Sequence, residues 1–303
     1  MQLSSSQIEQ LNFEPKDLSY KQCTWIGNHY NRKLGGIDVC DGKGLNGSIA
    51  PQATLDVLRL LFEAADEYLK SQTPPVFIDA GTAEGRALLY WAFSVSARRP
   101  PEFNFETINV YGFELPHKKS YEHIHRASEA CAKTKLGCPV KINVVWKDVA
   151  HVESLRTELG FLNETKSVLY SFWTAWSAEN KDSLLALIGE EPNVVALAVY
   201  IRRGDTNSSG GPFDEQHILS QLQNHSSSST WSIFSTVPLC RFIAGNERAR
   251  SVIFSRHKQS CIENATRITL SDTLHPLCND GFSVLDQDGW VEMCMECGGG
   301  GGG

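Results

Sequence analysis

The chain has 303 residues, of which 41% are hydrophobic and 21% charged, and its formal net charge is −7. This composition is typical of a globular protein with a sizeable core, and it excludes a collagen-like or largely disordered chain. The acidic balance argues against nucleic-acid binding through bulk electrostatics. No apolar run is long enough to cross a membrane, and the first residues lack the basic and apolar regions of a signal peptide. We therefore expect an intracellular protein, cytoplasmic or nuclear, whose nine cysteines are free thiols.

Predicted helices and strands alternate along most of the sequence. Apolar spacing predicts, in chain order, a helix over 52–68, a strand over 76–80, a helix over 84–95, a strand over 108–115, a helix over 118–136, a strand over 140–146, a helix over 152–161, a strand over 167–173, a helix over 178–188 and a strand over 193–201. Such alternation predicts a parallel sheet with helices on both faces. After Arg203 the pattern weakens into loops, and two further strands over 230–242 and 249–258 are expected to pair antiparallel.

Three parts are expected along the chain. Residues 1–45 have little periodicity and suggest an N-terminal arm, 46–258 an α/β domain with a sheet of about seven strands, and 259–303 an acidic, loosely ordered tail that ends in glycines. In the tail, Cys294 and Cys297 have the spacing of half a zinc site. Cys261 and Cys278 do not form a matching second pair, so no metal site is predicted.

The turn after the first predicted strand, "VFIDAGTAEG", carries the clearest chemical signal. Ligands of parallel sheets bind beyond the carboxyl ends of the strands, and glycine there lets a backbone approach a ligand closely. A dinucleotide fingerprint would have a glycine where Ala83 stands, and Asp79 would repel a pyrophosphate. A carboxylate at this position suits a ligand with an ammonium group, because opposite charges attract at short range. S-adenosylmethionine has an ammonium group and no phosphate.

The same segment resembles motif I of the class I S-adenosylmethionine-dependent methyltransferases, in the form D-x-G-x-A-x-G. The resemblance continues with Glu114, at the end of the second predicted strand, where that family has an acid that binds the ribose hydroxyls. It also extends to Asp148, after the third strand, where the family contacts the adenine. It implies a Rossmann-like α/β fold with a C-terminal antiparallel hairpin and S-adenosylmethionine as cofactor.

Within that class, residues 47–201 are most similar to the DOT-type histone-lysine methyltransferases, which lack a SET domain. The similarity rests on the "NGSI" loop before motif I, on "GFELPHKKSYEHIHRASE" and on "LYSFWTAWSAENKDSLLALI". The loop has Asn46 and Ser48 where that family has Tyr and Glu, and Phe172 and Trp173 stand where it has paired Asn. The resemblance implies the following cofactor-binding residues: Gly47, Ile49, Asp79, Gly81, Thr82, Ala83, Gly85, Glu114, Leu115, Asp148, Val149 and Ser171.

No catalytic acid or base is predicted, because a deprotonated amine needs only to be held in line with the methyl group. Phe172, Trp173 and Trp176 are candidates for a substrate channel, since aromatic faces attract a lysine-type cation, although core packing explains them almost as well. Protein lysine is the first acceptor by resemblance, and a small molecule or another protein nitrogen is the second; the net charge does not favour a nucleosome. A catalytically inactive interaction protein with the same fold is the alternative, and a nicotinamide oxidoreductase a distant third.

Overall fold

A computed structural model describes residues 51–65, 68, 76–83, 85–98, 107–116, 121–122, 124–125, 140–160, 165–174, 176–202, 204–227, 229–238 and 249–258, together with the backbone of a short antiparallel pair, β1 (Asp38–Val39) and β2 (Leu45–Asn46). The rest of the predicted arm, the predicted tail with its cysteines, and most of the predicted 118–136 helix lie outside these residues. Among the described helices none is both long and apolar enough to span a membrane.

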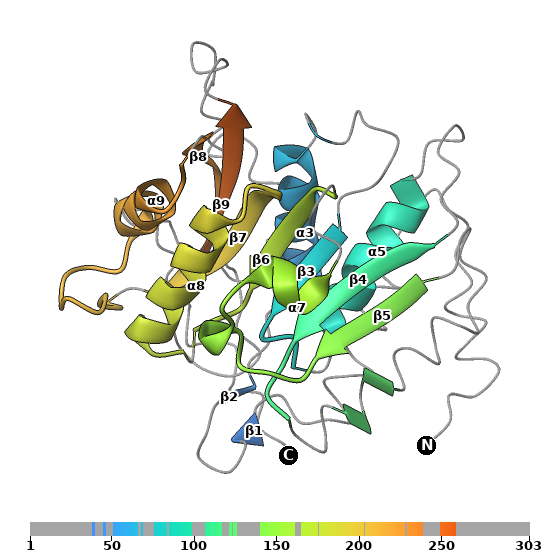
Figure 1. Cartoon of the computed structure of the whole chain (residues 1–303). Helices are drawn as coiled ribbons and strands as arrows, with labels where there is room; N and C mark the ends of the chain where they lie inside the picture. Colours follow the sequence, from blue (N-terminus) through green and yellow to red (C-terminus); the bar gives the residue numbers. More distant parts are fainter. Residues whose placement is uncertain are drawn as a thin grey trace, which may run out of the picture.

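A seven-stranded sheet forms the centre of the molecule, in the order β5-β4-β3-β6-β7-β9-β8 (Figure 1). The strands are β3 (Val76–Ala80), β4 (Ile108–Phe113), β5 (Val140–Val145), β6 (Ser167–Ser171), β7 (Val194–Arg202), β8 (Ser229–Pro238) and β9 (Ala249–Lys258). The first five are parallel to one another, and β9 runs antiparallel between β7 and β8. The predicted α/β class and the C-terminal antiparallel hairpin are confirmed.

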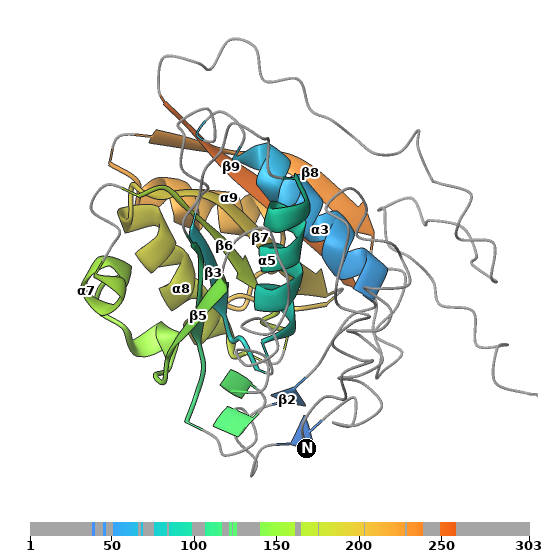
Figure 2. The ribbon, with the colours of Figure 1, turned by 90° about the vertical axis from the view of Figure 1, so that its right-hand side faces the viewer.

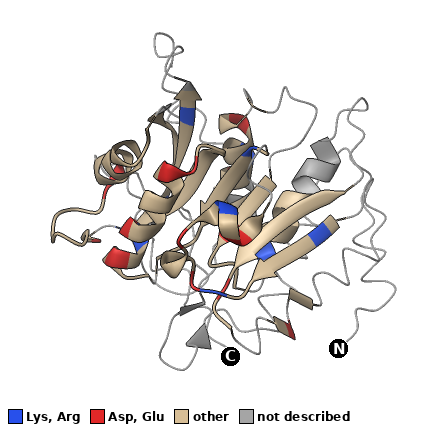
Figure 3. Ribbon diagram, viewed as in Figure 1, with Lys and Arg blue, Asp and Glu red and all other residues tan. Residues whose placement is uncertain are grey.

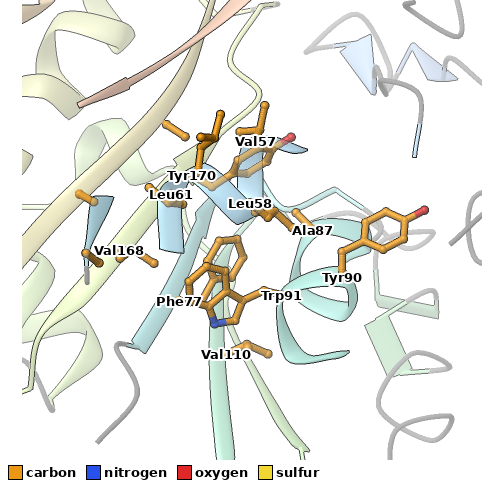
Figure 4. Close-up of a cluster of buried hydrophobic side chains, with 14 of the residues drawn as sticks. Val57, Leu58, Leu61, Phe77, Ala87, Tyr90, Trp91, Val110, Val168 and Tyr170 are labelled. Atoms are coloured by element: carbon orange, nitrogen blue, oxygen red, sulfur yellow. The ribbon is translucent and has the colours of Figure 1, made fainter. Parts of the chain in front are cut away.

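Helices cover both faces of the sheet, as Figure 2 shows. On one face lie α3 (Pro51–Ala64) and α5 (Arg86–Arg98); on the other lie α8 (Ala178–Glu190) and α9 (Glu215–Asn224), with the short α7 (Leu155–Leu159) and the 3-10 turn η1 (Val149–His151). Each face therefore encloses its own apolar layer. In the first layer the Phe77 and Trp91 rings stack with centroids 4.8 Å apart, against Leu58 and Val110 (Figure 4).

Local sequence explains where the second-face helices begin. The Ser177 hydroxyl accepts the Asn180 N–H at the start of α8, and the Asp214 carboxylate accepts the His217 N–H at the start of α9. Both are the usual N-cap bonds that satisfy otherwise unpaired N–H groups. Helix α9 is not predicted from the sequence: the Gly- and Ser-rich segments on either side of it read as loops, and the short stretch between them was given no element. The predicted 152–161 helix is shorter than expected, because Val152 still caps the preceding η1, Ser154 is the N-cap of α7 and Gly160 ends the helix.

We expect Gly189→Ala to destabilise the protein, because α8 and α9 meet at this glycine. An added Cβ would lie 2.6 Å from the His225 Cβ and 3.0 Å from the Leu222 carbonyl oxygen. The clash should lower the free energy of unfolding by about 1–3 kcal/mol in urea denaturation. Ser183→Ala, at an exposed position of the same helix, is the control and should leave stability within about 0.5 kcal/mol. Equal stability of the two variants would contradict this packing.

Candidate functional site

The turn that follows β3 is hydrogen-bonded to the neighbouring strand β4. The backbone N–H groups of Gly81 and Thr82 both donate to the Phe113 carbonyl, each at 2.9 Å, and the Gly85 N–H donates to the Thr82 carbonyl at 2.8 Å. Gly81 and Gly85 have φ angles of 82° and 79°, which glycine adopts without steric cost. Ala83 has φ 47°, which is uncommon for a residue with a Cβ and needs support from its surroundings.

Glu114 supplies that support from the end of β4. Its Oε2 accepts the Ala83 N–H at 2.6 Å, and its Oε1 accepts the Leu115 N–H at 3.0 Å. The carboxylate thus holds the left-handed residue of the turn through a charge-assisted hydrogen bond. A carboxylate has about four lone-pair sites, so these two bonds alone do not saturate the Glu114 carboxylate.

Asp79 lies at the base of the turn and is 2% exposed. Its Oδ2 accepts the Thr82 hydroxyl at 2.8 Å, whereas its Oδ1 is buried and has no hydrogen-bond partner among the described residues. Burial raises the pKa of this carboxyl from 3.8 to about 7, against the lowering effect of the Thr82 hydrogen bond, and the nearby charge of Glu114 raises it further. Such a carboxylate suits a positively charged ligand group.

Two close approaches shape the site. A Cβ on Gly112 of β4 would lie 2.8 Å from the Thr82 Cγ2, so the absence of a side chain there lets Thr82 lie flat against β4 and reach Asp79. A Cβ on Gly81 would lie 3.1 Å from the Trp176 Cζ2, so the indole ring stands directly against the turn. The sequence reading missed Gly112, although a glycine inside a strand is a known sign of a close approach.

The remaining predicted cofactor residues are less uniform. Asp148 follows β5, where it caps η1 by accepting the Ala150 N–H at 3.0 Å. Its neighbour Val149 is buried, while Leu115 is 41% exposed. Ser171 is buried and donates its hydroxyl to the Ala80 carbonyl at 2.8 Å, which ties β6 to β3. Since β3, β4, β5 and β6 are parallel neighbours, all these residues lie at the carboxyl ends of the strands, on the same side of the sheet. Gly47 and Ile49 lie outside the described residues.

The three aromatic candidates for a substrate channel divide into two groups. Trp173 belongs to the core: it is 0% exposed, donates its indole N–H to the Tyr200 carbonyl at 2.5 Å and packs edge-on against Phe213. The prediction that it lines a channel is therefore wrong. Phe172 and Trp176 are half-buried, Phe172 edge-on to Tyr200 with ring centroids 5.0 Å apart and Trp176 against Gly81. These two remain able to border an acceptor.

The donor set at this end of the strands suits a cationic, hydroxyl-bearing ligand. Within the described ranges no group of three or more His, Cys, Asp or Glu could hold a metal ion. The features that do fit a ligand are the unpartnered Asp79 oxygen, the glycine turn and the Glu114 carboxylate. S-adenosylmethionine fits them, because its ammonium group and ribose hydroxyls complement the two carboxylates.

No family model and no curated protein sequence matches this chain. Among solved structures, it is similar to a protein from Listeria monocytogenes assigned to the class I S-adenosylmethionine-dependent methyltransferases. The TM-score is 0.51 at 10% identity, and the alignment covers 88% of this chain and 77% of that one. At this identity the likeness shows the fold alone, which is that of the class I methyltransferases.

Two further alignments have lower TM-scores. The first is to EvdMO1, with a TM-score of 0.39 and 15% identity over 68% of this chain. This chain spans only 41% of that protein. The second is to the N-terminal domain of EvdMO1 with S-adenosylhomocysteine bound, with a TM-score of 0.38 and 13% identity over 68% of this chain and 82% of that domain.

The raised pKa of Asp79 predicts how stability depends on pH. Between the unfolded value of 3.8 and the folded value of about 7, the folded carboxyl holds a proton that the unfolded one has lost. This contribution to stability is present in full below the unfolded pKa and is lost as the pH rises through the folded pKa. From pH 5 to 8 the wild type should lose about 3 kcal/mol of unfolding free energy relative to Asp79→Asn. Urea denaturation at the two pH values measures this, and parallel pH profiles of the two proteins would refute it.

Proposed function

We propose that the protein binds S-adenosylmethionine at the carboxyl edge of β3, β4 and β5 and transfers its methyl group to an acceptor. The observation that carries this proposal is the buried Asp79 oxygen without a partner in the described chain, beside a left-handed turn that Glu114 holds. An ammonium group near Asp79 would compensate the burial of that carboxylate. The class I methyltransferase fold supports the proposal independently.

A phosphate-bearing cofactor suits this edge less well. Dinucleotide sites bind a pyrophosphate through free N–H groups of the glycine turn and of the helix N-terminus that follows it. Here the Gly81 and Thr82 N–H groups are bonded to Phe113, and the Ala83 N–H is bonded to Glu114. Two carboxylates close to the turn would in addition repel the phosphates. The same arrangement favours a cationic ligand.

Each residue has a proposed role toward the cofactor. Asp79 would face the ammonium group and Glu114 the ribose hydroxyls, with Leu115, Asp148 and Val149 around the adenine. When bound, S-adenosylmethionine supplies an electrophilic methyl group on its sulfonium. The chain's own part is to hold the acceptor in line with that methyl and to keep water away, which by itself accounts for much of the rate. Trp176, which lies against Gly81, would exclude water from the turn.

The acceptor that we propose first is a protein lysine, by the resemblance to the DOT-type family. Phe172 and Trp176 support it, because aromatic rings near the turn can hold a lysine side chain. The class I fold itself serves many acceptors, so a small molecule is the second candidate. In Figure 3 the described basic residues are scattered among acidic ones, with no basic band on the face shown. This favours free histones or another protein over an intact nucleosome.

Phe172 is the specific observation that favours the alternative of a catalytically inactive interaction protein. It stands where the DOT-type family has an Asn, and its ring packs on the buried Tyr200 instead of presenting a polar group. A protein of this kind would keep the fold and the cofactor and bind a partner without methylating it. Binding and transfer therefore have to be measured separately.

Titration calorimetry with S-adenosylhomocysteine tests the cofactor. We expect Glu114→Gln to weaken binding by about tenfold to hundredfold, because the amide cannot accept the Ala83 and Leu115 N–H groups and the ligand hydroxyls together. Glu63→Gln is the matched control, since Glu63 is an exposed residue of α3 that pairs with Arg59, and it should bind as the wild type does. If the wild type does not bind, or if Glu114→Gln binds unchanged, the site assignment is wrong.

Transfer of a labelled methyl group tests the acceptor. Purified protein is incubated with labelled S-adenosylmethionine and free histones, and in parallel with a small-molecule fraction. Label on histone lysines, lost in Glu114→Gln and kept in Glu63→Gln, is the expected result. Label in the small-molecule fraction would overturn the lysine acceptor. Tight cofactor binding with no label in any fraction would favour the inactive interaction protein.

A further inference from the structure

The groups around Asp79 form a cluster with more acids and hydroxyls than cations. Asp79, Thr82, Glu114, Tyr170 and Tyr200, together called the Asp79 cluster below, come from β3 and its turn, the end of β4, β6 and β7. Asp79 lies opposite Tyr170 in the β3–β6 register, and the Tyr170 and Tyr200 hydroxyls are 3.1 Å apart. Thr82 makes the one hydrogen bond to Asp79 that the described chain contains.

We propose that ligand binding at this site is coupled to the release of one proton from the Asp79 carboxyl, so that an ammonium-bearing ligand replaces the proton as the compensating positive charge. This inference rests on the proposed function and goes beyond it, because it concerns the protonation state of the unliganded site. The step is balanced: the ligand keeps its ammonium proton, the O–H bond of Asp79 breaks, and the proton leaves to solvent.

The surroundings favour the neutral carboxyl before binding. Glu114 contributes a negative charge from β4, and the buried Tyr170 and Tyr200 contribute neutral hydroxyls from β6 and β7. Helix α5 contributes Tyr90 and Arg86. Burial and the charge of Asp79 raise the pKa of the Tyr170 hydroxyl, and the positive charge of Arg86 partly offsets that rise. No described cation forms an ion pair or hydrogen bond with Asp79, whose own pKa is raised to about 7, chiefly by burial.

A nearby ammonium group favours the ionised form of Asp79 instead of the neutral form, and it need not form a hydrogen bond with Oδ1 to do so. An opposite charge within about 4–6 Å stabilises the ionised form, and the effect is larger in a poorly solvated site. Affinity for such a ligand should therefore fall about tenfold for each pH unit below the pKa of Asp79 and level off above it. A ligand without the ammonium group should show no such dependence.

Calorimetry in pairs of buffers with different ionisation enthalpies counts the released protons directly, without any measurement of activity. S-adenosylhomocysteine, whose amino group stays protonated over the range used, should release about one proton at pH 6 and almost none at pH 8.5. Methylthioadenosine has the same nucleoside and no amino-acid group, and its heat of binding should be independent of the buffer at both pH values.

Two variants assign the proton to its residue. In Asp79→Asn the buffer dependence at pH 6 should disappear, and binding of S-adenosylhomocysteine should be weaker than wild type at pH 8.5 but similar at low pH. In Glu114→Gln, binding should still release a proton, but the pH at which half a proton is released should be lower than in the wild type. The reason is that the negative charge of Glu114, which raises the pKa of Asp79, is gone.

The outcomes separate this inference from the proposed function. Binding of S-adenosylhomocysteine with no proton release at pH 6 would overturn the coupling and leave the cofactor assignment standing. Release that persists in Asp79→Asn would also overturn it, since another group would then be the source. Failure of both nucleoside ligands to bind the folded wild type at either pH would overturn the proposed function, and the coupling with it.

Discussion

Burial of a carboxyl group that has too few partners is the constraint on which the site depends. An ionised carboxylate in a poorly solvated interior is costly unless hydrogen bonds or a positive charge compensate it. Asp79 has one hydrogen bond, from Thr82, and that bond is possible because Gly112 leaves room for the threonine beside β4. Thr82 thus links the turn to the neighbouring strand, through its N–H, and to the carboxyl group, through its hydroxyl.

The second carboxylate has a different task, although it lies close to the first. Glu114 is hydrogen-bonded through both oxygens to backbone N–H groups, so its charge is compensated locally and it stabilises the left-handed Ala83. One acid therefore shapes the turn, while the other has no compensating charge from the described residues and can take it from a proton or from a cationic ligand. This division follows from environment alone, because Asp and Glu carry the same chemical group.

Much of the fold follows from local patterns, and parts of the site do not. The all-apolar "VVALAVYI" of β7 and the D-x-G-x-A-x-G turn are signals within a few residues, and they correctly predicted a parallel strand and the turn between a strand and a helix. Helix α9 was missed because it is only ten residues long, buries only Ile218 and Leu222, and lies between Gly- and Ser-rich segments. The burial of Trp173 depends on Phe213, forty positions further along the chain, and the unpartnered Asp79 oxygen depends on strands that meet only in three dimensions.

The position of β9 has a consequence for how the protein reaches this fold. This last described strand lies inside the sheet, between β7 and β8, and α3 from near the start of the chain packs against it. During synthesis, β7 and β8 emerge before β9, the strand that separates them. Helix α3 is made much earlier, so an even longer time passes before β9, against which it packs, is available. Such long-range contacts slow folding. Until residues 249–258 arrive, one edge of β7 therefore keeps its backbone N–H and C=O groups unpaired, and this is the interval in which we expect chaperone binding to matter most.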